Sequence, residues 1–126
     1  MTLADEPGEP PALRSGESVA DAARLAVEVG AEALLFNCSQ PEVMEPAIVE
    51  ARMVLPPRLR VGAYANAFEQ KEHGYAANGV ILEHRAELND GGYSSFGARW
   101  IDAGADIVGG CCGIMPEHIG ELHALR

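Results

Sequence analysis

The chain has 126 residues, 48% of them hydrophobic and 22% charged, which suits one globular domain with an apolar core. Nine basic residues against nineteen acidic ones give a formal net charge of −10. This balance argues against a nucleic-acid-binding surface and against binding to an anionic membrane. We therefore expect neither a nucleic-acid nor a membrane partner.

The N-terminus has neither the basic start nor the apolar core of a signal peptide, and no apolar stretch is long enough to span a bilayer. The expected location is the cytoplasm, whose reducing conditions suit free thiols. The chain has three cysteines, an odd number, and two of them are neighbours that are poorly placed to bridge each other. These features favour metal binding or a reactive thiol over a disulfide framework.

The first half of the chain predicts a loop, a helix, a strand and a second helix. Residues 4–17 are rich in Pro, Gly and acidic residues and predict the loop. Ser18 predicts the cap of a helix with an apolar stripe, which Gly30 ends. Residues 33–37 predict a short strand buried on both faces.

The second helix is expected to have Pro46 in its first turn and to end before Pro56 and Pro57, with residues 41–44 as a loop before it.

The rest of the chain predicts a strand, a long connection and two more helices around a last strand. In chain order these are a strand over 59–65, a connection over 66–91 with local helix over 83–88, a helix over 93–103, a strand over 105–109 and a helix over 116–125.

Alternation of helices and strands predicts parallel strands covered by helices, an α/β fold. A weak internal repeat supports this prediction, because residues 30–35 resemble residues 104–109 without gaps. The same register places Cys38 over Cys112. Repeated βα units favour a barrel or a doubly wound sheet.

All three cysteines lie where a predicted strand ends. Cys38 follows the strand over 33–37, and Cys111 and Cys112 follow the strand over 105–109. In βα folds the carboxyl ends of parallel strands open onto one face, where active sites gather. The three thiols can therefore meet, and three thiolates with a fourth position left open are typical of a zinc site that binds a substrate.

At these residues the chain resembles the homocysteine S-methyltransferase family, which includes betaine-dependent enzymes and the zinc domain of cobalamin-dependent methionine synthase. The matching segments are Phe36-Asn37-Cys38, residues 64–69, residues 104–113 and residues 116–119. The resemblance implies the C-terminal half of a (β/α)8 TIM barrel. It implies that residues 1–126 form one truncated homocysteine-binding domain, which lacks about the first four βα units of the family. Residues 1–3 would then be the end of the fifth strand.

The resemblance also implies a reaction, namely zinc-dependent methyl transfer from a donor to the thiolate of homocysteine, forming methionine. Zn²⁺ would be held by Cys38, Cys111 and Cys112. Five further residues are expected to contact the ligands or the substrate: Asn37, Tyr64, Asn66, Glu69 and Gly110. For the four of these that have side chains, loop capping and packing are the alternatives. Gly110, together with Gly109, is expected to let the backbone turn tightly into the two cysteines.

Two other functions stay open. One is an inactive fragment, or one half of a split enzyme that needs a complementary half-barrel chain; an open half-barrel could also form a homo-oligomer. The weaker one is a thiol redox or metal-buffering module, against which the absence of a Cys-x-x-Cys motif counts. The four histidines are expected at the surface or in helix packing, and Trp100 and Phe96 are expected to anchor the core.

Overall fold

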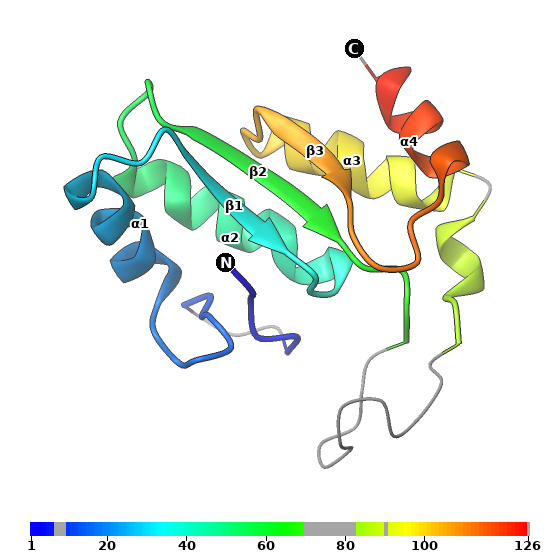
Figure 1. The fold of residues 1–126 in the computed structure, drawn as a ribbon, viewed down its shortest axis with the longest axis horizontal. Coiled ribbons are helices and arrows are strands. Elements are labelled where there is room, and N and C mark those ends of the chain that lie inside the picture. Colours follow the sequence, from blue (N-terminus) through cyan, green and yellow to red (C-terminus); the bar gives the residue numbers. More distant parts are fainter. Residues whose placement is uncertain (7–9, 70–82, 90, 126) are drawn as a thin grey trace.

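The computed structural model describes residues 1–6, 10–69, 83–89 and 91–125. Its centre is a parallel sheet with the strand order β1-β2-β3 (Figure 1). The strands are β1 (Ala33–Asn37), β2 (Arg60–Ala65) and β3 (Ile107–Gly110). The described helices are α1 (Val19–Glu28), α2 (Pro41–Val54), the short 3-10 helix η1 (Ala86–Leu88), α3 (Gly92–Asp102) and α4 (Pro116–His123). None of the helices in these ranges has the length and hydropathy needed to cross a membrane.

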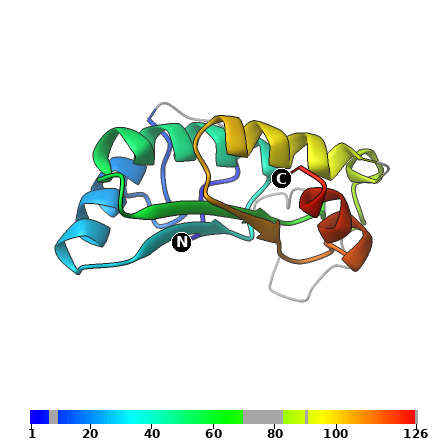
Figure 2. The ribbon, with the colours of Figure 1, turned by 90° about the horizontal axis from the view of Figure 1, so that it is seen from above.

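Helices α2 and α3 pack side by side on one face of the sheet (Figure 2). The sheet residues that belong to the core include Phe36, Val61 and Ala63, all fully buried. Trp100 of α3 is fully buried as well, and its indole N–H donates to the backbone carbonyl of Pro41 at 3.3 Å. The predicted α/β architecture with parallel strands is confirmed, and so is the role of Trp100 as a core anchor.

The second face of the sheet is only partly buried, so the prediction that β1 is buried on both faces was wrong. Leu34 and Phe36 are buried, whereas Ala33, Leu35 and Asn37 alternate with them and are partly exposed. The reason is that α2 and α3 both lie on the other side of the sheet (Figure 2). Apolar side chains therefore remain accessible on the face that carries Leu35.

Helix α2 begins one turn earlier than predicted, at Pro41 rather than near Pro46. Pro41 occupies the first helical turn, where a missing N–H costs nothing. Val43 and Met44 are buried in the core, and their burial favours the extra turn. Pro46 consequently lies inside the helix, where it removes one backbone donor.

Other element boundaries differ by a few residues. Strand β3 starts at Ile107 and not at residue 105, because the carboxylate of Asp106 accepts a hydrogen bond from the Val61 N–H at 2.8 Å and pairs with Arg52. The helix predicted over 83–88 is only the turn η1. Residues 70–82 and 90 of the long connection lie outside the described residues. The N-cap of Ser18 is confirmed, since its hydroxyl accepts from the Asp21 N–H at 3.0 Å.

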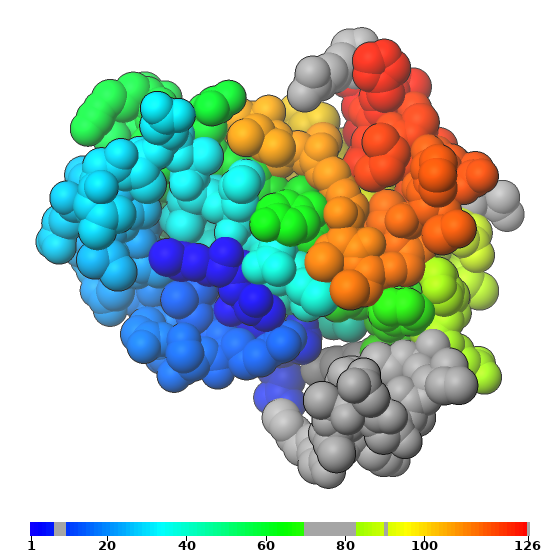
Figure 3. Space-filling view, viewed as in Figure 1, coloured from blue at the N-terminus to red at the C-terminus, as the bar shows by residue number. Residues whose placement is uncertain are grey.

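The first residues of the chain lie along the free edge of β1. The Met1 amino group donates to the Leu35 carbonyl at 2.5 Å, and the Asn37 N–H donates to the Met1 carbonyl at 2.8 Å. This alternation is the hydrogen-bond pattern of two parallel strands. In the space-filling view the N-terminal segment, in dark blue, lies against β1, in cyan (Figure 3).

Candidate functional site

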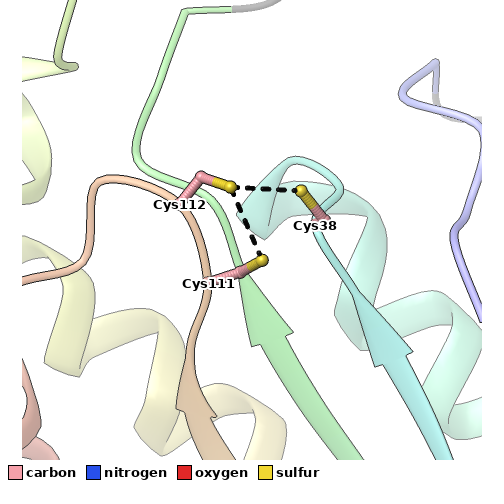
Figure 4. Close-up of side chains that lie close together, drawn as sticks. All are labelled: Cys38, Cys111 and Cys112. Atoms are coloured by element: carbon pink, nitrogen blue, oxygen red, sulfur yellow. Dashed lines mark hydrogen bonds between the residues drawn. The ribbon is translucent and has the colours of Figure 1, made fainter.

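The three cysteines meet at the carboxyl ends of β1 and β3 (Figure 4). The Sγ atom of Cys112 lies 3.7 Å from that of Cys38 and 3.8 Å from that of Cys111. All three sulfur atoms lie within 4.8 Å of one another. The structure thus brings together residues that are more than seventy positions apart, as the strand-end placement predicts.

The end of the central strand holds the backbone of all three cysteines. The Cys38 N–H donates to the Tyr64 carbonyl at 3.1 Å, and the Cys111 N–H donates to the Ala65 carbonyl at 2.9 Å. One residue beyond Asn66, the Ala67 N–H donates to the Cys112 carbonyl at 2.9 Å. The spacing of the sulfur atoms therefore depends on how β1 and β3 align with β2.

Cys38 has a positive φ of 55°, which is uncommon for a residue other than glycine. Such a conformation costs free energy and persists only where the surroundings enforce it. Asn66 supplies one constraint, since its side-chain N–H donates to the Cys38 carbonyl at 3.1 Å. Its side-chain oxygen accepts from the Phe68 N–H at 3.1 Å, so both polar atoms of the side-chain amide are hydrogen-bonded. Asn66 thus orients the backbone of Cys38.

The remaining predicted side chains lie around this cluster at different places. The Asn37 side chain accepts a hydrogen bond from the Thr2 hydroxyl at 3.3 Å. Tyr64 lines an apolar hollow on the uncovered face of the sheet, next to Leu35. Glu69 is exposed and lines a second hollow, in which none of the described lining residues is a cysteine.

The prediction for Gly109 and Gly110 was wrong, because both lie in β3 and neither has a positive φ. The positive φ of this segment belongs to Gly113, at 76° after the cysteines. Gly110 is needed for a different reason: a Cβ there would lie 2.1 Å from Cγ2 of Ile114. The missing side chain lets the loop after the cysteines fold back onto β3.

We expect Gly110→Ala to lower the free energy of unfolding by about 1–3 kcal/mol, because Ile114 must move to make room. Gly109→Ala is the matched control, since its Cβ would meet Tyr64 at an ordinary 3.7 Å. Urea denaturation followed by circular dichroism measures both. Equal losses in the two variants would contradict the role given to the Ile114 contact.

The surroundings of Cys38 do not favour its ionisation. Burial, followed by contact with the other two thiols, raises the pKa of Cys38 to about 12. A protonated thiol is a poor nucleophile, so these surroundings favour the unreactive form of Cys38. A cation placed among the sulfur atoms would reverse this preference.

The cluster fits a zinc ion. A tetrahedral zinc ion with Zn–S bonds of about 2.3 Å needs sulfur atoms about 3.8 Å apart. The two shorter separations, 3.7 and 3.8 Å, match this value. Thiolates are soft ligands that favour zinc over calcium or magnesium.

Two residues near the cluster were not predicted from the sequence to have a functional role. The Tyr93 hydroxyl contacts the backbone of β2 and β3 next to Cys111. The Arg85 guanidinium donates to the Gln40 side chain at 2.8 Å, and Gln40 donates to Asn66 at 3.4 Å. Arg85 also pairs with Glu42 and holds the pKa of that carboxyl below its usual range. Contacts over such sequence separations leave no pattern in a single sequence.

Of the histidines, His118 is buried and caps α4, where its Nδ1 accepts from the Met115 N–H at 3.0 Å. It also lies edge-on to Tyr93 at 6.0 Å. This agrees with the packing role expected for it. His73 lies outside the described residues.

Comparison with known proteins gives consistent matches. The sequence model of the family described as homocysteine S-methyltransferase matches residues 1–125. Homocysteine S-methyltransferase 1 of Zea mays is 31% identical over 108 residues, which are 85% of this chain and 32% of that protein. Homocysteine S-methyltransferase 2 of Arabidopsis thaliana is 28% identical over 106 residues, 84% of this chain and 28% of that protein.

A third relative, selenocysteine Se-methyltransferase of Brassica oleracea var. italica, is 26% identical over 84% of this chain and 28% of its own length. The chain thus spans less than a third of these proteins. Among solved structures, the oxidized form of the homocysteine methyltransferase MmuM from Escherichia coli has a TM-score of 0.64 and 22% identity. That match covers 91% of this chain and 32% of the MmuM chain, and it supports the fold.

Proposed function

The chain belongs to the homocysteine S-methyltransferase family, and on this premise we propose that it is the zinc-binding part of an enzyme that methylates the thiol of homocysteine, forming methionine. The observation that carries the proposal is the convergence of Cys38, Cys111 and Cys112 at the strand ends. We expect the reaction in the cytoplasm, where the thiols stay reduced.

The three cysteines would hold Zn²⁺ and leave its fourth position to the substrate. Zinc bound in this way lowers the pKa of a further sulfur ligand, so that homocysteine can react as a thiolate. In the transfer, a sulfur lone pair forms the bond to the methyl carbon, and the donor leaves with the electron pair of the bond that breaks. The chain contributes by holding the thiols and by orienting the sulfur toward the methyl group.

The substrate-contacting roles of the other predicted residues remain proposals. Asn37 ends β1, which leads into Cys38, and is paired with Tyr64 near the end of the neighbouring strand β2, which supports a role for both in lining the substrate site. Glu69 is exposed on the segment that leaves β2. Asn66 acts indirectly, through the carbonyl of Cys38.

We propose further that the chain is the C-terminal part of a (β/α)8 barrel. Three parallel strands with helices over one face suit such a part. Leu35, Tyr64 and Ile107 are partly exposed on the other face, which would be the inside of the barrel. The strand-like hydrogen bonds of Met1 with Leu35 and Asn37 suit a sheet that continues at this edge of β1.

A second candidate is one half of a split enzyme that needs a complementary chain. It is favoured by the apolar hollow beside β1, which is lined by Leu25, Val29 and Leu35 among others. The Val29 residue is 70% exposed and Leu25 is 52% exposed. Accessible apolar surface of this kind marks interfaces between proteins.

The proposal is tested by measuring zinc content and methyl transfer for the chain alone and for the chain joined to the N-terminal part of the Zea mays relative. We expect about one zinc ion per chain in both forms and methionine formation only in the joined form. The same fusion carrying Cys112→Ser is the control for metal-dependent transfer. A folded chain without zinc would contradict the metal site. A zinc-loaded fusion that forms no methionine would contradict the reaction.

A further inference from the structure

Tyr93 is fully buried in α3, and its hydroxyl reaches the backbone of the sheet. The hydroxyl oxygen lies 3.1 Å from the Ala65 nitrogen and 2.8 Å from the Gly109 carbonyl oxygen. Burial raises the pKa of this phenol, so it keeps its proton. With one proton and two lone pairs, it can accept from Ala65 and donate to Gly109 at the same time.

These two contacts lie at the last pairing of β2 with β3 before the cysteines. Ala65 is paired with Gly110 in the parallel register, and its carbonyl accepts from the Cys111 N–H at 2.9 Å. The Tyr93 hydroxyl therefore joins the two strands beside the bond that anchors Cys111. Cys38, in contrast, is anchored on β2 through Tyr64 and Asn66.

The ring of Tyr93 is itself held in place. It lies edge-on to Trp100 at 5.5 Å and to His118 at 6.0 Å between centroids. Phenylalanine would fill the same space, so core packing alone does not require the hydroxyl. A buried hydroxyl is costly unless it is hydrogen-bonded, and here its bonds are to the backbone of β2 and β3.

We propose that Tyr93 is a positioning residue of the metal centre: by joining Ala65 to Gly109 it sets the alignment of β3 with β2, and with it the spacing of Cys111 and Cys112 from Cys38. This inference rests on the proposed function, because it needs the three thiolates to bind zinc. Groups that orient metal ligands typically change metal affinity by about 10–100-fold when they are removed.

The test is Tyr93→Phe, which removes only the oxygen atom. We expect zinc affinity, measured by competition with a chromophoric chelator, to fall about tenfold or more. In the Co²⁺-substituted chain, the visible absorption bands should shift, because they report the arrangement of the sulfur ligands. A loss of stability alone would not move these bands.

Ser18→Ala is the stability control. It removes the hydrogen bond that caps α1 and so lowers stability, whereas the ring partners of Tyr93 lie on α3 and α4. We expect this variant to be less stable but to keep the zinc affinity and the cobalt spectrum of the unsubstituted chain.

Three outcomes can be told apart. Unchanged zinc affinity and an unchanged cobalt spectrum in Tyr93→Phe would overturn the inference and leave the proposed function standing. Equal losses of zinc affinity in Tyr93→Phe and Ser18→Ala would assign the effect to stability and also overturn it. If the unsubstituted folded chain binds no zinc, the proposed function itself fails.

Discussion

Cys112→Ser is expected to weaken zinc binding by more than about 100-fold, a larger effect than that of removing a group that only orients a ligand. Cys112 is the sulfur closest to both others, at 3.7 and 3.8 Å. A serine hydroxyl is not ionised at neutral pH and is a harder ligand than a thiolate. Chelator competition with the purified variant measures the change directly.

The fold should survive this substitution, because Cys112 is exposed. In the presence of a chelator, the free energy of unfolding should differ from that of the unsubstituted chain by no more than about 0.5 kcal/mol. Met53→Ser is the matched control, since it removes a sulfur atom from a residue that is 76% exposed on α2. Zinc affinity that is equal in the two variants would show that Cys112 is not a ligand.

The order of helices and strands and the meeting of the cysteines could be predicted from the sequence, because both depend on local signals. Gly30 and Gly104 have positive φ values of 71° and 108° and end α1 and α3, as the internal repeat indicates. The same repeat relates Cys38 to Cys112, whose sulfur atoms lie 3.7 Å apart. Parallel strands place equivalent positions at the same edge of the sheet, so the two cysteines that the repeat aligns in sequence lie close together in space.

The features that the sequence did not predict depend on tertiary contacts. The start of α2 at Pro41 follows from burial of Val43 and Met44, which outweighs the local tendency of Pro46 to begin a helix. The hydrogen bonds of Tyr93 and Arg85 cross 28 and 45 positions of the chain. Such contacts require the packed structure and have no periodicity that a sequence could display.

Trp100→Ala is expected to lower the free energy of unfolding by about 3–5 kcal/mol, because it leaves a large cavity in the core. The indole is fully buried between α3 and α2, and the substitution also removes its hydrogen bond to the Pro41 carbonyl. A domain of this kind has a total stability of about 5–15 kcal/mol, so the variant should be close to unfolding. Urea denaturation with a chelator present measures the loss.

Ile101→Ala is the control for this loss, since the neighbouring residue on α3 is 36% exposed and a change there should cost much less. Similar losses in the two variants would contradict the role of Trp100 in the core.

The change in stability on adding zinc distinguishes a core variant from a variant of the metal site. A ligand that binds only the folded state adds about 2.7 kcal/mol of stability at 100 times its dissociation constant. Trp100→Ala keeps all three cysteines, so zinc should restore part of its stability, whereas Cys112→Ser should be stable without zinc and gain little from it. If zinc stabilised both variants equally, the metal would be binding somewhere other than the cysteine cluster.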